Sequence, residues 1–371
     1  MSLSIDRAGA LLSIDIDAVI ANWRTVSARM RTGTRCAAVV KADAYGLGAD
    51  KIAPALLAAG CRRFVVATID EGIALRPLLA DADIIVLGGA FPGTEAEFLA
   101  HNLWPVLNSP EQVAGWVALC RAQGQHLPAV LHVDTGMSRL GLSHAEAVAL
   151  AADRRSLDAV SLALVMSHLA CADDPAHDMN AQQLARFNAA RALFPGVPGS
   201  LAASSGIFLG ADWHADWARP GAALYGLQPT AEGVNPMAPV VRLQGRIIRV
   251  RDVDAGDTVG YGATYHRSDK GRLAIVAAGY ADGLFRSLGN RGCGHLGENR
   301  VPLVGRVSMD LVTFDVTGIP AAQAHPGALI DLIGPAHSID DIAREAGTIG
   351  YEVLTALGRR YHRVHLGGAA A

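Results

Sequence analysis

The sequence predicts an α/β protein: a (β/α)8 barrel of the TIM type over residues 1–235, followed by a C-terminal, mostly β-stranded domain over residues 236–371. Short apolar runs alternate with helical segments seven or eight times in the first part, and they are apolar on both faces, as parallel strands are. The length of this part is close to the roughly 250 residues typical of such a barrel. After Pro239 the pattern changes to period-2 runs broken by glycine.

The first domain is expected to open with a strand at Leu12–Ile16 and a helix that begins at Ala18. The other expected strands are Ala37–Val40, Phe64–Ala67, Ile84–Leu87, Trp104–Leu107, Ala129–Val133, Ser161–Met166, Leu201–Ala203 and Ala222–Tyr225. The helices expected between them are Ala49–Ala59, Glu71–Leu79, Thr94–Ala100, Pro110–Gln123, His144–Ala152 and Asn180–Leu193. The same alternation also allows a doubly wound open sheet, which is the alternative fold.

The second domain is expected to be a β-sandwich or β-barrel, because its short strands alternate with glycine turns. Its expected strands are Val240–Val250, Leu273–Ala278, Pro302–Val307, Leu311–Val316 and Ala328–Ile333, with a single clear helix at Ile339–Ala346. The boundary near residue 235 falls in a stretch that contains proline and glycine, Pro229–Pro239.

Composition narrows the possible classes of protein. Apolar residues make up 51% of the chain and charged residues 18%, which is typical of a folded protein and not of a disordered one. The net charge is −3 and no block of like charge occurs, so we expect neither a nucleic-acid nor a membrane partner. Asp6, Asp15 and Asp17 interrupt the place where a signal peptide would be apolar. Five scattered cysteines without a CxxC motif predict no disulfide framework and no metal site, and favour the cytoplasm.

Several polar residues follow the expected strands of the barrel, where the active site of such a fold lies. They are Lys41 with Tyr45, Asp134 with Arg139, His168, Ser204 and Arg219. Together they resemble the parts of a pyridoxal phosphate site, which needs an amine for the Schiff base, donors for the phosphate and a partner for the ring nitrogen. Gly221 would let the backbone approach an anion closely.

Each of these residues also has an ordinary structural interpretation. A lysine at the end of a buried strand is either desolvated, with a lowered pKa, or extends into solvent along its apolar stem. His168 taken alone is more often a hydrogen-bonded core histidine. Ser204 with the following Ser205-Gly206 either holds a phosphate or forms a common turn. Arg219 is either a barrel-end cation or a surface arginine in a turn.

Longer motifs are similar to those of alanine racemases, in the same order and along nearly the whole chain. In the barrel they are VKADAYG at 40–46, VDTGMSRLG at 133–141 and RPGAALYG at 219–226. In the second domain they are GYGATY at 260–265, GYADG at 279–283 and GRVSMD at 305–310.

The resemblance implies a racemase of alanine that uses pyridoxal 5′-phosphate, supplies D-alanine for peptidoglycan or serves alanine catabolism, and forms a head-to-tail homodimer with a shared active site. The implied catalytic residues are Lys41, which carries the Schiff base, and Tyr261 from the partner subunit. Implied cofactor contacts besides Lys41 come from Tyr45, His168, Ser204, Arg219 and the Gly221 backbone. The substrate carboxylate would be held by Arg139 and the Met309 backbone, and Arg286, Tyr280 and His132 would support the site.

Racemisation needs two acid/base groups on opposite faces of the substrate Cα, and Lys41 and Tyr261 would fill these roles. A phenol has a pKa of about 10, so nearby positive charge from Arg286 or His168 would have to favour its phenolate. Tyr265 would point to the same side as Tyr261 in a regular strand, and only the resemblance selects Tyr261. A charged Arg219 would disfavour protonation of the cofactor ring and so limit transamination and decarboxylation.

The chain departs from the family pattern at three positions. His132 stands where many members have a carbamylated lysine that orients the carboxylate-binding arginine, so activity is expected to be insensitive to bicarbonate. Ala203 replaces a frequent asparagine, and Gly358 stands where some members have tyrosine. The pocket size is therefore open. A pyridoxal phosphate racemase of another amino acid and a non-catalytic pyridoxal phosphate carrier are the alternative functions.

Overall fold

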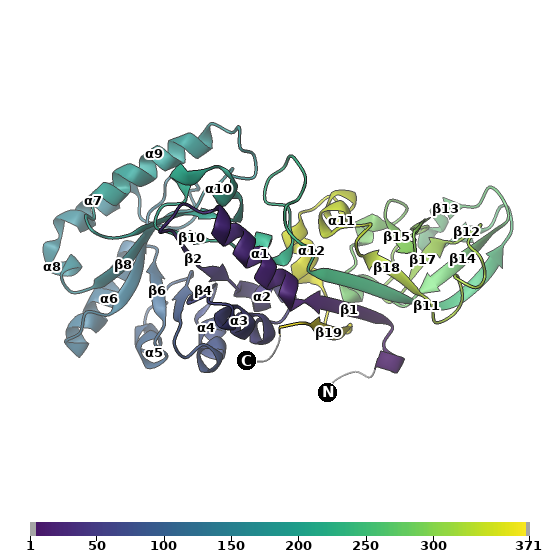
Figure 1. The fold of residues 1–371 in the computed structure, drawn as a ribbon, viewed down its shortest axis with the longest axis horizontal. Coiled ribbons are helices and arrows are strands. Elements are labelled where there is room, and N and C mark those ends of the chain that lie inside the picture. The colour runs from purple at the N-terminus through teal and green to yellow at the C-terminus, as the bar shows by residue number, and fades with distance from the viewer. Residues whose placement is uncertain (1–4, 369–371) are drawn as a thin grey trace. The chain divides into compact units, whose positions relative to one another are not determined.

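The computed structural model describes residues 5–368, which divide into two compact units. One unit contains residues 19–224 and 228–237, and the other contains residues 5–18, 225–227 and 238–368. Figure 1 shows helices around the strands of the first unit and a strand-rich second unit. The expected boundary near residue 235 stays a prediction.

The first unit is a parallel barrel, as expected, and not an open sheet. Its strands are β2 (Arg35–Cys36), β3 (Ala38–Val39), β4 (Arg63–Val66), β5 (Asp83–Val86), β6 (Trp104–Leu107), β7 (Pro128–His132), β8 (Ser161–Met166), β9 (Gly199–Ala203) and β10 (Trp217–Arg219). They pair in the order β2-β10-β9-β8-β7-β6-β5-β4-β3. Only Ala37 separates β2 from β3. The Ala37 amide donates to the Ala218 carbonyl of β10 (2.9 Å), and β3 pairs with β4. The segment of β2 and β3 therefore bonds to strands at both ends of the pairing order and closes the barrel.

Helices follow most barrel strands, and local capping sets their starts. The main ones are α1 (Ile16–Arg29), α3 (Ala49–Ala58), α4 (Ile69–Leu75), α5 (Glu95–Ala100), α6 (Pro110–Gln123), α7 (His144–Ala152) and α9 (Met179–Ala192). Thr68 and Ser143 cap α4 and α7 with capping boxes. In each box the cap hydroxyl accepts the amide of a glutamate three residues later, and that glutamate's carboxylate accepts the amide of the cap residue. Ser109 caps α6, with Pro110 at the first helical position.

One expected barrel strand is wrong. Ala222–Tyr225 forms a 3-10 turn, η4, and the last strand is β10, which ends at Arg219. Pro220 has no amide hydrogen to donate to a strand ladder, and the amides of Gly221 and Ala223 donate to the Ser204 hydroxyl instead.

The second unit contains one eight-stranded sheet built around a long strand, β11 (Val241–Val253). The other strands are β1 (Ala10–Asp15), β14 (Gly271–Val276), β15 (Cys293–Leu296), β16 (Asn299–Pro302), β17 (Val312–Asp315), β18 (Leu329–Ile333) and β19 (His362–Leu366). β11 pairs with β1 and β18 near its start and with β14 near its end. The strand near the N-terminus therefore joins this sheet and not the barrel.

Two further expectations for this unit need correction. The run Pro302–Val307 is not a strand: β16 ends at Pro302, and Gly305 adopts a φ of 78° that breaks the extended backbone. Besides the expected helix α11 (Ile339–Ala346), a second helix, α12 (Gly350–Ala356), follows. A separate hairpin joins β12 (Thr258–Val259) to β13 (Tyr265–His266).

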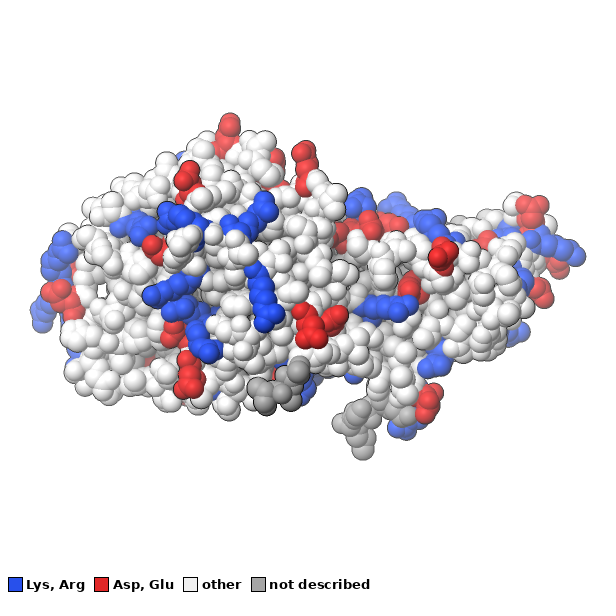
Figure 2. Space-filling view, viewed as in Figure 1, with Lys and Arg blue, Asp and Glu red and all other residues white. Residues whose placement is uncertain are grey.

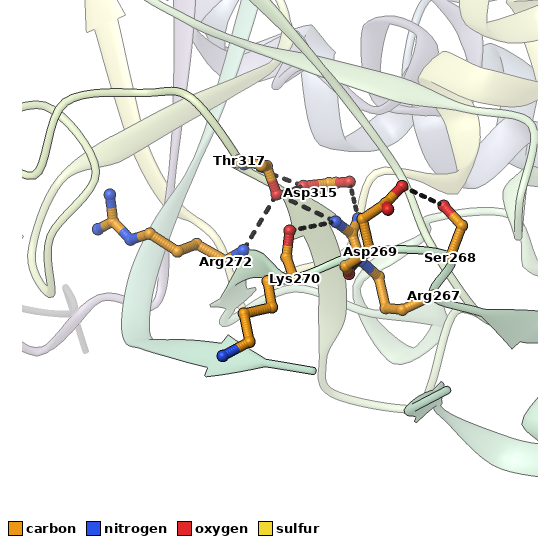
Figure 3. Close-up of polar contacts among 7 residues, drawn as sticks. All are labelled: Arg267, Ser268, Asp269, Lys270, Arg272, Asp315 and Thr317. Carbon is orange, nitrogen blue, oxygen red and sulfur yellow. Dashed lines mark hydrogen bonds and ion pairs between the residues drawn. The ribbon is translucent and has the colours of Figure 1, made fainter. Parts of the chain in front are cut away.

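A buried ion pair anchors this hairpin to the sheet. The Arg267 guanidinium pairs with the Asp315 carboxylate on β17, and it also donates to the carbonyls of Asp269 (3.2 Å) and Lys270 (3.3 Å) (Figure 3). The Thr317 hydroxyl completes the network by accepting the Arg272 amide (3.0 Å). Arg267 thus fixes the end of β13 against β14 and β17.

We expect Arg267→Met to lower the free energy of unfolding by about 3 kcal/mol, because it leaves the Asp315 carboxylate buried without its partner. Arg242→Met is the matched control: its pair with Asp331 is half exposed on the arginine side, so the loss should stay below about 1 kcal/mol. Urea unfolding of the two variants measures the difference. Equal losses would contradict a special role for the Arg267 network.

Basic and acidic side chains lie side by side over the face shown in Figure 2. Neither sign forms one continuous patch on that face. Across residues 5–368, no helix combines the length and the apolar character that a membrane span requires.

Candidate active site

Lys41 begins a left-handed turn directly after the first barrel strand. In α2 (Lys41–Gly46), the four residues from Ala42 to Tyr45 have φ values between 51° and 58°. This conformation costs roughly 1–2 kcal/mol for each residue that is not glycine, and such strain concentrates at functional sites. The turn places Lys41 and Tyr45 at the C-terminal end of the barrel strand.

Two carboxylates hold this strained turn in place. Glu71 Oε1 accepts the Ala42 amide (2.7 Å), and Glu71 Oε2 accepts the Ala67 amide at the end of β4 (2.7 Å). Asp43 Oδ1 accepts the Ala49 amide (2.8 Å), which ties the turn to α3. Glu71 is not among the site residues expected from the sequence, although its capping-box spacing from Thr68 is visible there.

The environment of Lys41 differs from that of the other two lysines in the sequence, Lys51 and Lys270. Those two have well-exposed side chains, 57% and 87% respectively. Burial lowers the pKa of Lys41, and the positive charge of Arg139 lowers it further, while Glu71 opposes the shift. Lys41 is therefore the lysine best suited to act as a nucleophile or a base near neutral pH.

Two buried hydroxyls and backbone amides form a small polar cradle. The Ser204 hydroxyl accepts the amides of Gly221 (2.9 Å) and Ala223 (3.1 Å). A Cβ atom at position 221 would collide with the Tyr45 hydroxyl, so only glycine fits there. Tyr45 and Ser204 are both buried. Hydroxyls and backbone amides gathered in this way fit a phosphate group.

Arg219 is a buried cation without a carboxylate partner in the described part of the chain. Its side chain is 3% exposed, and it donates to the Ser200 hydroxyl and to the Ser167 carbonyl (2.6 Å). Burial lowers the pKa of Arg219 to about 10, so the guanidinium still carries its charge at neutral pH. An unpaired buried charge is costly, which suits a group that must face an acceptor on a bound ligand.

The structure brings His168 close to the cationic residues at this end of the barrel. Burial lowers the pKa of His168 to about 3, and the charges of Arg219, Arg139 and Lys41 add to the shift. His168 is therefore neutral at working pH. The expectation that His168 supplies positive charge to Tyr261 is therefore wrong, and Arg286 is the other residue expected to supply it.

His132 is also neutral, and its tautomer can be assigned. Burial and the charge of Arg219 lower its pKa to about 4. Its Nδ1 lies 2.7 Å from Asn108 Oδ1, while the Asn108 amide group donates to the carbonyls of Leu87 (2.9 Å) and Val106 (3.1 Å). His132 Nδ1 therefore carries the proton, and Nε2 is an acceptor. Asn108, which sequence reasoning missed, fixes this orientation.

The loop that carries Arg139 is organised by Asp134. Its Oδ1 accepts the amides of Gly136 (2.9 Å), Met137 (3.0 Å) and Ser138 (3.2 Å). The Arg139 side chain is exposed, and its charge acts on Lys41, His132 and His168. Of the barrel residues selected from the sequence, Lys41, His132, Arg139, His168 and Arg219 thus belong to one electrostatic group.

The two histidines make stability depend on pH. Their pKa values fall from 6.5 to about 4 and about 3, so the folded chain binds fewer protons than the unfolded chain below pH 6.5. The contribution of the two histidines to the free energy of unfolding is fully present above pH 6.5. It is lost as the pH falls toward their pKa values in the folded state. Between about pH 7.5 and about pH 5.5 we expect a loss of roughly 1 kcal/mol for each histidine.

Urea unfolding of the cofactor-free protein at both pH values measures this loss. His132→Asn and His168→Asn should each reduce it, whereas replacement of the exposed His126 by asparagine should not. A wild-type stability that does not change over this range would contradict the neutral assignment of both rings.

Tyr261 lies in the second unit, in the 3-10 turn η5 (Tyr261–Ala263), and 71% of it is exposed. Tyr265 is the first residue of β13 and packs partly buried against Val253, Val259, Leu273 and Val304. The two tyrosines do not share one regular strand, because Gly260 and Gly262 both adopt a φ of 73° and interrupt it. Tyr261 is thus accessible, whereas Tyr265 belongs to the core.

The segments that carry Tyr280 and Met309 in the second unit are joined by hydrogen bonds. The Met309 carbonyl accepts the Ala281 amide (2.9 Å), and the Ser308 carbonyl accepts the Tyr280 amide (3.0 Å). Arg286 lines a cleft of about 310 Å³ together with Thr264 and Arg306. Because Arg306 also lies against Gly262, Arg286 is near the turn that carries Tyr261.

Comparison with known proteins identifies the family. The family model described as "Alanine racemase, N-terminal domain" matches residues 14–229, and that described as "Alanine racemase, C-terminal domain" matches residues 240–365. The chain belongs to the alanine racemase family. Alanine racemase of Rhodospirillum rubrum is 56% identical over 96% of both chains, and that of Rhizobium meliloti is 51% identical over 98% of both.

Solved alanine racemase structures have the same fold. The structure from Bartonella henselae, with covalently bound pyridoxal phosphate, covers 97% of this chain and 100% of its own, with a TM-score of 0.93 and 38% identity. The biosynthetic alanine racemase of Pseudomonas aeruginosa covers 97% and 100%, with a TM-score of 0.89 and 33% identity. Both domains of the alanine racemase family are therefore present in one chain.

Proposed function

We propose that the protein interconverts L-alanine and D-alanine with pyridoxal 5′-phosphate bound at the end of the barrel. One observation carries the proposal: an amine of lowered pKa, a cradle of hydroxyls and amides, and a buried unpaired guanidinium occur together after barrel strands. These are the parts that the cofactor needs. The second domain argues against a non-catalytic carrier, which would need only the barrel.

The residues present fit the cofactor. Lys41 Nζ would hold its aldehyde carbon, and Tyr45, Ser204 and the Gly221 amide would hold its phosphate. Arg219 would donate to the ring nitrogen, and His168 would lie near the ring. When bound, the cofactor delocalises the electron pair left on Cα after proton removal, and this acidifies the Cα proton.

The chain's own residues supply the rest of the reaction. Lys41 Nζ takes or returns the proton on one face of Cα, and its lowered pKa favours the unprotonated amine that this role requires. Arg219 stays charged and would donate to the ring nitrogen, which would disfavour protonation of that atom and favour return of the proton to Cα. Arg139 binds the substrate carboxylate, and the acceptor Nε2 of His132 helps to orient it.

The second proton transfer is assigned to Tyr261 of the partner subunit in a head-to-tail homodimer. The barrel group offers one amine, and its two histidines have pKa values of about 4 and about 3, which makes them weak bases, so the second acid/base is assigned elsewhere. In the second unit Tyr261, Tyr280 and Met309 are 71%, 44% and 54% exposed, and exposed apolar side chains of this kind mark interaction surfaces.

All five cysteines are free thiols, which supports a location in the reducing cytoplasm.

The test is to incubate the purified protein separately with L-alanine, L-serine, L-lysine and L-arginine and to measure the D-enantiomers. We expect D-alanine to form fastest, and the rate to disappear when the cofactor is removed and to return when it is restored. Faster conversion of another amino acid would assign the protein to a different substrate. Binding of the cofactor at Lys41 without racemisation would favour the carrier function.

A further inference from the structure

A group of metal-ligating side chains lies in the second unit, apart from the residues assigned to racemisation. Cys293 and His295 are both on β15 and, being two residues apart, they point to the same face of the sheet. His337 lies in the turn that precedes α11, where its amide donates to the Gly334 carbonyl (3.1 Å). Glu345 lies on α11. The fold thus joins residues whose spacing matches no familiar metal motif.

The donor atoms are close enough to share one ion. One ligand atom each from Cys293, His295 and His337 lies within 4.8 Å of the others. Cys293 Sγ is 3.7 Å from His337 Nε2, and His337 Nε2 is 3.2 Å from Glu345 Oε2. Ligands around a tetrahedral zinc ion are separated by about 3.5 Å, given Zn–S and Zn–N bonds of about 2.3 and 2.0 Å.

The group is buried, and part of its hydrogen-bonding capacity is unused. Cys293, His295 and His337 are 7%, 9% and 5% exposed. Nδ1 of His295 and Nδ1 of His337 are both buried without a hydrogen-bond partner. Buried polar atoms normally find partners. The unpaired Nδ1 of His295 is open to a ligand, whereas His337 turns Nε2, and not its unpaired Nδ1, toward Cys293 and Glu345.

The charged neighbours of the group permit a cation. Glu345 carries negative charge, and the cysteine would add another as a thiolate. Arg300 and Asp331 lie opposite His295 on the two neighbouring strands, and Arg242 holds the Asp331 carboxylate through two hydrogen bonds (2.9 and 3.0 Å). Among the described residues, Arg300 is the cation whose charge acts on both Cys293 and His295, and a Cys293 thiolate together with Glu345 would exceed its charge.

We propose that Cys293, His295 and His337 form a zinc-binding site that stabilises the second domain, with the Glu345 carboxylate beside His337 placed to complete it. One sulfur and two imidazole nitrogens are zinc ligands, and a carboxylate oxygen as the fourth would give the tetrahedral set of structural zinc sites. With Glu345 bound, no position would stay open for catalysis.

The site would connect the β15–β16 hairpin to helix α11. Ser287 donates to the Ala346 carbonyl at the end of α11 (2.8 Å), and the Gly292 amide donates to the Leu288 carbonyl (2.8 Å). Both contacts belong to η7 (Arg286–Leu288), the turn that carries Arg286. Bound zinc would hold Cys293 and Glu345 on either side of this turn and so fix its position.

The experiment uses the holoenzyme, first stripped with a chelator and then reloaded with Zn²⁺ or Co²⁺ alone. We expect one zinc per chain, a metal shell with one sulfur at about 2.3 Å by X-ray absorption, and visible Co²⁺ bands of a tetrahedral thiolate site. Zinc should raise the melting temperature of the wild type. Absence of stoichiometric metal, or a shell without sulfur, would overturn the proposal.

Cys293→Ser and His295→Asn should lose the Co²⁺ thiolate bands and the zinc-dependent rise in melting temperature. Glu345→Gln, which is on a partly exposed helix face and less disruptive to folding, should weaken zinc binding by at least about tenfold. Cys120→Ser is the control, because Cys120 is as buried but lies on α6 of the barrel unit. Metal binding that survives in all three site variants would also overturn the proposal.

Discussion

Lys41→Ala is expected to abolish the reducible covalent link to pyridoxal 5′-phosphate and to lower alanine racemisation at least about 10³-fold. The loss is expected to be large because, in the proposed mechanism, the same amine holds the cofactor and moves a proton on one face of Cα. Burial and the charge of Arg139 lower the pKa of Lys41, so no other lysine has the same reactivity. Borohydride reduction followed by mass spectrometry measures the link, and D-alanine formation measures the rate.

Lys51→Ala is the matched control, since Lys51 lies on the neighbouring helix α3 with an exposed side chain and an ion pair to Asp50. It should keep both the link and the rate. A reducible adduct that persists in Lys41→Ala at Lys51 or Lys270 would show that the cofactor is attached elsewhere. Added methylamine should restore part of the Lys41→Ala rate, because a free amine can replace the missing base.

The barrel could be predicted because its strands are buried on both faces and its helices carry their own start signals. β6, α6, α7 and β8 have the bounds that the sequence indicates. The expected strand Ala222–Tyr225 failed for a reason outside its own residues. Its apolar run is typical of a buried strand, yet the Ser204 hydroxyl takes the amides that a strand would use.

The candidate site could be predicted only in part, because a sequence motif does not reveal the residues that hold its members in place through hydrogen bonds. Lys41 and Ser204 follow barrel strands, and Arg219 is the last residue of β10. Glu71 and Asn108 act on Ala42 and His132 from other barrel segments, and no sequence pattern joins them to the site. The group around Cys293 was missed in the same way, since its members meet only when β15 and α11 are folded.

The structure distinguishes Tyr261 from Tyr265, which the sequence motif alone does not. Period-2 reasoning places Tyr261 and Tyr265 on one side of a strand. The structure instead breaks the strand at Gly260 and Gly262, which exposes Tyr261 and packs Tyr265 into the core. Tyr261 is thus the more accessible of the two phenols.

Tyr261→Phe is expected to lower the racemisation rate by about 10²–10⁴-fold, the usual contribution of one acid/base group, while cofactor absorbance stays unchanged. The effect should depend on the face of Cα that is tested. In D₂O, Lys41 still removes the Cα proton of one enantiomer, so that enantiomer keeps exchanging its hydrogen with solvent. The other enantiomer should lose exchange along with racemisation.

Tyr265→Phe is the control for this experiment, because it removes the same hydroxyl from a tyrosine that packs against Val253, Val259, Leu273 and Val304. It should keep most of the racemisation rate and the exchange of both enantiomers. A uniform loss of exchange for both enantiomers in Tyr261→Phe would indicate a structural role for the phenol. Loss for one enantiomer alone identifies it as the base on the face opposite Lys41, since two proton transfers from opposite sides are the stereochemical requirement of racemisation.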